Sequence, residues 1–286
     1  MSATGVIARL MLREVLRRRL ILALLVLTVL AIALTAWGFS RIPSLSQRGV
    51  PIPDAQVKLI ASQLLILVMF MFSNVLALSA VFVASPALSG DLESGIALAM
   101  LSRPITRAQY VTGKWLGLAV LVVAYALVAA SLELLAVNAV VGYLPPRPLE
   151  FLGFLIAEGL VLLTFGLVLS TRLSGMVGGV IALILFGMAW LGGIVGGIGA
   201  AFDNELIERV GTATKLILPT DGLWRGAVYT LEPAAMLAAA AGAGPAFAAN
   251  PFYAPAPPPA AYLVWCAAWL GGMLALAIWS FRYREI

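Results

Sequence analysis

The chain has 286 residues, of which 62% are hydrophobic and 11% are charged, and its net charge is +5. Soluble domains are about 45–50% apolar and about 25% charged, so this composition excludes an ordinary soluble protein and indicates a membrane protein. The chain has no histidine and one cysteine, Cys266, which excludes an internal disulfide, Cys/His metal sites and Ser–His or Cys–His catalysis. The basic residues lie beside apolar runs, which favours an anionic membrane surface over nucleic acid as their partner.

Six apolar runs are each long enough to cross a bilayer, which takes about 20 mostly apolar residues. The sequence therefore predicts an all-α integral membrane protein with six transmembrane helices in one domain, 1–286. The five residues 171–175 predict a tight turn between two antiparallel neighbours. The runs cover residues 20–37, 59–87, 115–141, 149–170, 176–200 and 260–281.

The distribution of Lys and Arg predicts the orientation of these helices, because cytoplasmic segments carry more of them. An even number of crossings puts both termini on one side. If that side is the cytoplasm, the inner segments carry eleven of the eighteen basic residues, which predicts a multi-pass protein of the cytoplasmic (inner) membrane with both termini inside. The eleven are Arg9, Arg13, Arg17, Arg18, Arg19, Arg103, Arg107, Lys114, Arg172, Arg282 and Arg284.

The N-terminal segment 1–19 precedes the first apolar run. Its apolar residues recur at helical spacing, with Arg9, Arg13 and Arg17 opposite them, which predicts a basic amphipathic helix in the headgroup plane. The alternative is a segment that acts only as a topology signal. The first run exceeds the usual 7–15 residues of a signal-peptide core, so we expect a retained anchor rather than a cleaved signal.

Residues 88–114 interrupt the apolar pattern on the side predicted to be cytoplasmic. We expect one helix from about 91 to 101, with Asp91 and Glu93 near its positive N-terminal end, ended by Pro104. Thr106 and Gln109 then form the S/T-x-x-E/Q pattern that caps a new helix. This second helix leads into the third run, with aromatic and basic anchors expected at the membrane interface: Tyr110, Lys114 and Trp115.

The same segment resembles the cytoplasmic loop of ABC-2 type transporter permeases, and is most similar to the group that contains the NosY permease of nitrous-oxide reductase maturation. LPTDGLWR (218–225) is similar to the last outer loop of that group, and FRYREI (281–286) to its basic C-terminus, whereas 233–260 departs from its pattern. The motif reads acid-x-Glu-x-Gly, Leu-Ser-x-Pro-Ile-x-Arg and Tyr-x-x-Gly-Lys, at Asp91, Glu93, Gly95, Leu101, Ser102, Pro104, Ile105, Arg107, Tyr110, Gly113 and Lys114.

The resemblance implies a permease subunit, paired with a second permease copy as a homodimer or heterodimer and seated on two cytoplasmic ABC ATPase subunits. The segment 88–114 would be the coupling loop, with Asp91 and Glu93 meeting donors on the ATPase; a solvated acidic helix start is the alternative. The single Gly-Lys pair is Gly113-Lys114, and it lacks the rest of the G-x-x-x-x-G-K-[ST] pattern. We therefore expect no catalysis and no cofactor in this chain, with ATP and Mg on the partner.

Two carboxylates lie within the apolar runs, Glu133 in the third and Glu158 in the fourth. Both fall some 12–14 Å from the outer end of their helices at about 1.5 Å per residue, so we expect them at one level on neighbouring helices. Charged groups there are costly and often functional, which predicts a polar patch in the translocation path with Asn74 and Asn138. The alternative is hydrogen bonding between helices, to Asn138, Ser131 or Asn74.

Two further features concern packing and the outer side. The fifth run is rich in glycine pairs spaced by four, such as Gly192/Gly196, which suit either packing within the subunit or a dimer seam. The outer loop 201–259 predicts one or two short helices in its first half and an irregular second half. Within it, four residues predict a gate or partner contact, or a plain interfacial helix that Asp221 caps: Pro219, Asp221, Trp224 and Arg225.

Three classes of function remain open from the sequence. The first is the permease subunit of an ATP-binding-cassette exporter. The second is an autonomous proton-coupled secondary transporter that uses Glu133 and Glu158, although no inverted repeat supports it. The third is a membrane-embedded enzyme or assembly factor, for which the chain offers few reactive side chains.

Overall fold

A computed structural model describes residues 2–16, 19–44, 46–47, 50–240 and 250–284. These residues are helical apart from connecting segments and one short antiparallel pair, β1 (Ser46–Gln47) and β2 (Val50–Pro51). The helices are α1 (Ala3–Leu16), α2 (Arg19–Phe39), the 3₁₀ turn η1 (Ile42–Ser44), α3 (Asp54–Ala84), α4 (Pro86–Glu93), α5 (Ile96–Leu101), α6 (Arg107–Val141), α7 (Pro148–Ser170), α8 (Gly175–Ala201), α9 (Glu205–Ile217), α10 (Thr220–Leu231), α11 (Ala234–Ala240) and α12 (Ala260–Arg282).

Six of the described helical segments are long and apolar enough to cross a membrane, and they contain α2, α3, α6, α7, α8 and α12. Each coincides with one of the six apolar runs, so the predicted helical membrane fold is confirmed at this level. The turn between α7 and α8 occupies residues 171–174, as the sequence predicts. The capping box that begins α6 is also confirmed, since Thr106 and Gln109 bond each other's backbone amides.

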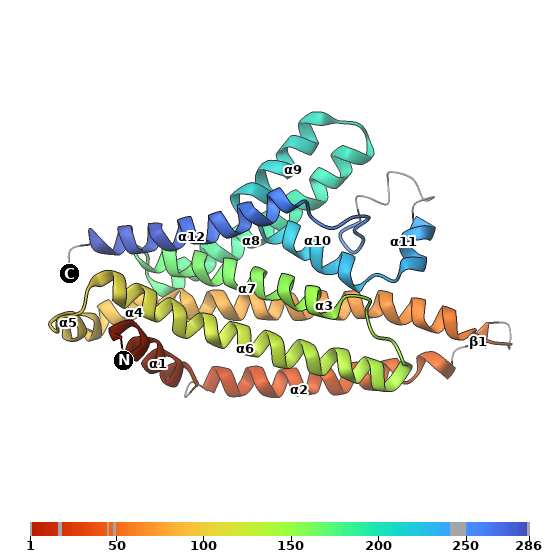
Figure 1. Cartoon of the computed structure of the whole chain (residues 1–286), viewed down its shortest axis with the longest axis horizontal. Helices are drawn as coiled ribbons and strands as arrows, with labels where there is room; N and C mark the ends of the chain where they lie inside the picture. Colours follow the sequence, from red (N-terminus) through yellow and green to blue (C-terminus); the bar gives the residue numbers. More distant parts are fainter. Residues whose placement is uncertain (1, 17–18, 45, 48–49, 241–249, 285–286) are drawn as a thin grey trace.

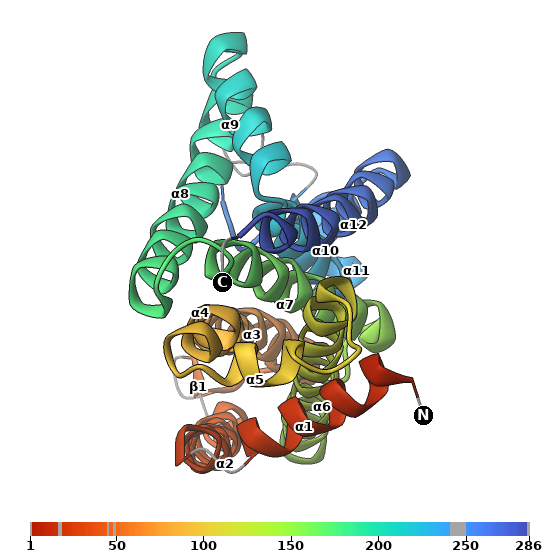
Figure 2. The ribbon, with the colours of Figure 1, turned by 90° about the vertical axis from the view of Figure 1, so that its left-hand side faces the viewer.

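Helix α7 lies at the centre of the bundle and packs against α3, α6, α10 and α12 (Figures 1 and 2). Two glycines permit this close packing. A side chain at Gly159 would overlap Val122 of α6, and one at Gly166 would press on Ala84 of α3. Because most of α7 is surrounded by other helices, polar groups on it must find partners inside the protein.

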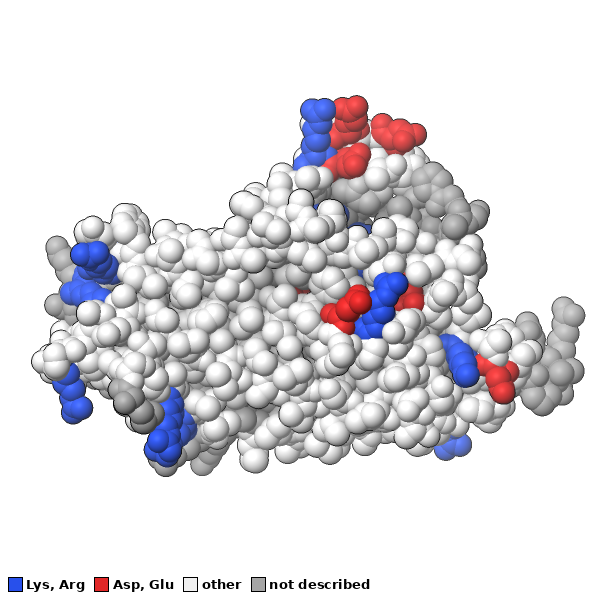
Figure 3. Space-filling view, viewed as in Figure 1, with Lys and Arg blue, Asp and Glu red and all other residues white. Residues whose placement is uncertain are grey.

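The two ends of the bundle differ in what they carry. The N-terminus, α1, α4, α5 and the C-terminal end of α12 gather at one end, and β1 and α11 lie toward the other (Figure 1). On the face shown in Figure 3, Lys and Arg mark the end with the termini, and a broad uncharged band follows. Helix α1 lies against α6, where Gly113 and Gly117 leave room for Ile7 and Met11.

The long segment after α8 is more helical than the sequence predicts. Its first half forms α9 and α10, as expected, but α11 occupies part of the second half that we expected to be irregular. Alanine has the highest helix propensity, and α11 is the run Ala234–Ala240 with only Met236 and Leu237 as other residues. Of the rest of the stretch expected to be irregular, 241–249 lies outside the described residues, and 250–259 forms no helix or strand, as predicted.

Candidate coupling segment and buried polar groups

The predicted single helix 91–101 is wrong, because the chain forms two helices there, α4 and α5. Gly95 separates them with φ of 75°, a left-handed conformation that glycine adopts without steric cost. Asp91 and Glu93 consequently lie in the last turn of α4 rather than near the start of a helix. Ser85 keeps helical backbone angles between α3 and α4, so α4 continues almost directly from the second membrane-spanning helix.

Asp91 lies in a buried ion pair rather than on the surface. Its carboxylate is 2.6 Å from the ammonium group of Lys114, and the two side chains are 9% and 6% exposed. The Tyr110 hydroxyl donates to the same carboxylate, and Glu14 of α1 lies 3.9 Å from Lys114. Asp91, Tyr110 and Lys114, which we call the buried charge cluster, join α4 to α6, and Glu14, 46% exposed at its edge, connects it to α1.

The predicted interface anchors therefore have other roles. Tyr110 and Lys114 are buried because α1 and α12 pack against α6, and Phe281 of α12 stacks on the Tyr110 ring. The indole of Trp115 donates to the Thr164 hydroxyl of α7 at 2.8 Å. All three residues hold helices together instead of facing the lipid headgroups.

Helix α4 is also bonded to α7. The hydroxyl of Ser170 accepts from the backbone amides of Leu88 and Ser89, at 3.0 and 3.1 Å. These amides lie in the first turn of α4, where helix N–H groups lack partners within the helix. Helix α4 is therefore connected to α6 through the buried charge cluster and to α7 through Ser170.

Arg107 binds the end of the chain. Its guanidinium donates to the backbone carbonyls of Phe281, Arg282 and Arg284, at 3.2, 3.0 and 2.7 Å. Those carbonyls end α12, where unpaired C=O groups attract a cation. The side chain that the motif suggested for coupling thus fastens the last turn of α12 to the start of α6.

The remaining motif residues form a surface at the same end of the bundle. Glu93, Ser102 and Pro104 are exposed, and Leu101 is half-buried. On α5, Ile96 and Leu98 are 50% and 54% exposed, whereas Ala97 is fully buried. We call the exposed set Glu93, Ile96, Leu98, Ser102 and Pro104 the α5 surface.

Glu133 and Glu158 do not share a site. Glu133 is buried, its hydrogen-bonding neighbour is Thr35 of α2, and one of its oxygens has no partner among the described residues. Glu158 accepts a 2.6 Å hydrogen bond from Ser73 of α3. The alternative prediction, hydrogen bonds between helices, named the right kind of contact but the wrong partners. The Asn74 amide donates to the Phe70 carbonyl of its own helix, and Asn138 is exposed.

A small cavity brings together residues that the sequence placed in two separate groups. Asn74 and Glu158 line it with Asp221 and Trp224, and its volume of about 10 Å³ is about the space that one water molecule needs. Among the described residues, three polar atoms in its wall have no hydrogen-bond partner. They are the Trp190 Nε1, Thr220 Oγ1 and Asp221 Oδ1 atoms, which would suit an ordered water.

Asp221 is surrounded by basic groups. Its carboxylate lies 3.1 Å from Arg225 and 3.6 Å from Lys215, and its side chain is fully buried. Arg225 also donates to the carbonyl of Gly193 on α8. Burial lowers the pKa of Lys215, and the Asp221 carboxylate acts in the opposite direction.

Helix α10 is thus part of the protein interior rather than an interfacial helix. Pro219 occupies the position before its first turn, no side chain caps it, and Asp221 lies inside the helix, so the predicted cap is wrong. Trp224 is 2% exposed and donates to the carbonyl of Pro251. The reason is that α10 packs against α7, α8 and α3, which cover most of its side chains.

The glycine pairs of α8 serve packing within the subunit. A side chain at Gly192 would overlap Thr214, and one at Gly196 would overlap Gly211, both of α9. Gly193 is in contact with the Asp221 carboxylate. The glycines therefore bring α9 and α10 onto α8, which is the first of the two alternatives that the sequence left open.

Comparison with known families decides what kind of membrane protein has this architecture. The family described as ABC-2 family transporter protein matches residues 6–286, nearly the whole chain. The chain belongs to the ABC-2 transporter family. No curated protein matches it. ABC-2 permeases are membrane components that normally work with ATPase partners, so this protein is a multi-pass transporter permease.

The ABC-2 chain also uses residues that its sequence did not single out. Glu14, Ser73, Ser170 and Lys215 each contact a residue of the predicted sites. A signal existed for Ser73, because a carboxylate within an apolar helix requires a donor from a neighbouring helix. Ser170 and Glu14 had none, since their partners lie on helices that only the tertiary structure brings together.

Proposed function

We propose that this ABC-2 permease is a subunit of an exporter, and that ATP hydrolysis on partner subunits drives it through the α5 surface. Two ABC ATPase subunits would bind ATP and Mg, and a second permease copy, identical or related, would complete the path. On the residues of the first motif, we further place the chain in the NosY-like group.

The observation that carries this proposal is that the α5 surface belongs to a helix packed against α4, whose Asp91 is part of the buried charge cluster. Two half-exposed apolar side chains, Ile96 and Leu98, suit a protein groove, because burying the exposed half of each would contribute about 0.8–1.5 kcal/mol. A force on α5 reaches α4, and from there α6 and α7. Motions of this kind are commonly transmitted by rigid helices that can pack against each other in two arrangements.

The same proposal gives the chain its orientation. The end that carries the termini and the α5 surface would face the cytoplasm, in agreement with the eleven basic residues of the inner segments. Helix α1 would lie at the inner headgroup level, with Arg9 and Arg13 exposed. The membrane would be the cytoplasmic (inner) membrane.

The outer half supports a role for the small cavity in transport. Glu158, Asn74 and Asp221 surround it, and α10 closes it from the outer side. We propose that α10 acts as an outer gate, so that a rearrangement at α4 is followed by a displacement of Asp221 from Gly193. Glu133 and Asn138 remain proposed members of the path on the α6 side, and an outer partner would bind the loop 201–259.

The test is purification of the tagged chain from its native membranes with its bound subunits. The proposal predicts a co-purifying ABC ATPase and ATP hydrolysis that vanadate inhibits. A chain that transports in proteoliposomes with a proton gradient and no ATPase would instead be a secondary transporter, and the proposal would be rejected.

A further inference from the structure

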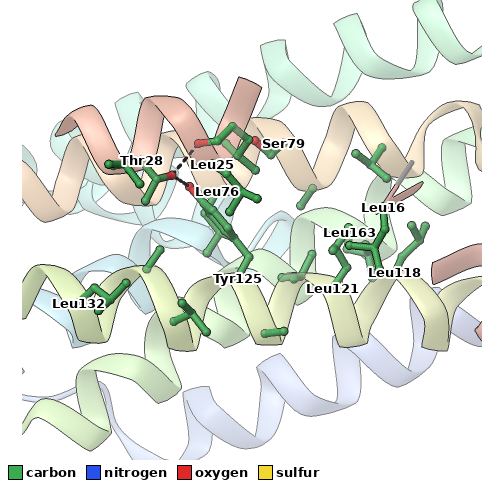
Figure 4. Close-up of a pocket in the computed structure, with 18 of the residues that line it drawn as sticks. Leu16, Leu25, Thr28, Leu76, Ser79, Leu118, Leu121, Tyr125, Leu132 and Leu163 are labelled. Atoms are coloured by element: carbon green, nitrogen blue, oxygen red, sulfur yellow. Dashed lines mark hydrogen bonds between the residues drawn. The ribbon is translucent and has the colours of Figure 1, made fainter. Parts of the chain in front are cut away.

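A second, larger cavity lies between α2 and the rest of the bundle. Its volume is about 280 Å³, and side chains of α2, α3, α6 and α7 line it. Figure 4 shows Leu25 and Thr28 of α2 opposite Leu76 of α3, with Leu118, Leu121 and Tyr125 of α6 along the same cavity. For comparison, a dry apolar cavity of about 150 Å³ holds a benzene molecule.

The wall of this cavity, which we call the groove, is mostly apolar. Apart from Thr28, Ser79 and Tyr125, its side chains are aliphatic. Thr28 and Tyr125 bond each other at 2.7 Å, and the Thr28 hydroxyl also donates to the Leu24 carbonyl at 2.8 Å (Figure 4). These hydroxyls are therefore occupied, and the groove suits a hydrocarbon better than a polar ligand.

The groove is long enough, and placed suitably, to hold one lipid chain. Along α6 it runs from Leu118 to Leu132, about 21 Å at ~1.5 Å per residue, which is more than the depth of one leaflet of the hydrocarbon core, about 15 Å. Helix α2, which forms the outer wall of the groove, is the first membrane-spanning helix. Only 17% of its most apolar stretch is buried in the protein. The groove thus lies next to the bilayer, in the depth range of acyl chains.

The end of the groove nearest α1 carries positive charge. Leu16, the last residue of α1, lines the groove. Arg13 precedes Leu16 by three residues, so the two are neighbours on the helix surface, and Arg13 is exposed. In the sequence, Arg17, Arg18 and Arg19 follow immediately. A hydrocarbon groove with an exposed arginine, Arg13, near its end matches an anionic phospholipid in both halves of its chemistry.

We propose that the groove binds one acyl chain of an anionic phospholipid, whose phosphate lies at Arg13. The lipid would fill the space between α2 and the bundle and hold α1 and α2 against α6. That the lipid comes from the inner leaflet rests on the proposed orientation of the permease; the binding site itself does not.

The experiment is native mass spectrometry of the purified chain, titrated with phosphatidylglycerol or phosphatidylcholine in detergent. The wild type is expected to retain one phosphatidylglycerol. Ala124→Trp, which fills the groove from α6, should weaken this binding about tenfold or more, because displacing two or three methylene groups costs about 0.8 kcal/mol each. Val120→Trp is the matched control, since Val120 is exposed on the same helix and does not line the groove.

A second pair of variants tests the headgroup. Arg13→Gln should lower the preference for phosphatidylglycerol over phosphatidylcholine about fivefold, the factor that corresponds to about 1 kcal/mol per basic residue at an anionic surface. Arg209→Gln, an exposed arginine on α9, should leave the preference unchanged. Ser79→Phe fills the groove from α3 and repeats the first test if Ala124→Trp does not fold.

Two results would overturn the proposal. One is equal lipid retention by the groove-filling variants and Val120→Trp, which would mean ordinary surface lipid only. The other is the absence of any preference for phosphatidylglycerol over phosphatidylcholine, both in the wild type and in Arg13→Gln. Neither measurement uses ATP or a partner, so a negative result here leaves the transporter assignment standing, and absence of an ATPase partner leaves this site standing.

Discussion

Removing the ammonium group of Lys114 tests the buried charge cluster. In Lys114→Met the carboxylate of Asp91 keeps the Tyr110 hydroxyl but loses its cation at 2.6 Å. Both side chains are less than a tenth exposed, so water cannot replace the lost partner. Breaking a buried ion pair by removing one member costs about 3–5 kcal/mol, and we expect a decrease of this size in the free energy of unfolding.

Comparison with a double variant separates the ion pair from simple packing. Asp91→Asn added to Lys114→Met removes the unpaired charge, so most of the lost stability should return. Arg209→Met breaks the exposed pair with Glu205, whose side chains are 77% and 80% exposed, and should cost about 0.3–0.5 kcal/mol.

The assay is reversible unfolding in mixed micelles as the fraction of SDS is raised, for the wild type, both single variants and the double variant. Strictly additive effects of Lys114→Met and Asp91→Asn would refute the reasoning, because they would show that the two side chains do not interact. A Lys114→Met variant as stable as the wild type would refute it as well.

Three other predictions concern the packing of the outer helices, a buried acid and the chain end. Gly193→Ala introduces a side chain into the Asp221 carboxylate and should cost about 1–3 kcal/mol of stability, whereas Gly187→Ala, with open space around it, should cost nothing; equal effects would contradict the close α8–α10 contact. Burial raises the pKa of Glu232 to about 8, from 4.5, so the folded protein binds the extra proton and its stability should fall as the pH rises from about 4.5 to 8. Unfolding of Glu232→Gln should lack this slope, and a slope identical to that of the wild type would exclude Glu232 as its source. Arg107→Gln should expose the end of α12 to faster tryptic cleavage at Arg282, with exposed Arg103→Gln as the control, and unchanged cleavage in Arg107→Gln would contradict the role of its three carbonyl bonds.

Much of the fold could be predicted because hydrophobic length alone defines a membrane-spanning helix. The start of α6 could be predicted equally well, because Thr106 and Gln109 form a local capping motif whose two residues lie three positions apart. The break at Gly95 also had a local signal, because glycine commonly ends a helix in the left-handed conformation. The prediction of one helix at 91–101 passed over that signal.

The candidate sites were less predictable because their contacts join distant parts of the chain. Asp91 and Lys114 both appeared in the motif, but only the tertiary structure shows that they bind each other. Glu158 and Asp221 meet in one cavity because α10 returns into the bundle, and nothing in the composition of the segment 201–259 predicts that return. Depth along a helix placed Glu133 beside Glu158, but it could not give the direction in which each side chain points.

The most direct test of the central claim is the ATPase activity of the permease with its co-purified ATPase in proteoliposomes, compared between the wild type and Leu98→Asp. Leu98 is 54% exposed on the α5 surface, and Leu206→Asp on α9, 74% exposed, is the matched control. Burial of the exposed half of Leu98 is worth about 0.8–1.5 kcal/mol, so its loss should lower vanadate-sensitive hydrolysis about fourfold or more in Leu98→Asp and leave Leu206→Asp active. Full activity in Leu98→Asp would contradict the claim that the α5 surface receives the motion of the ATPase.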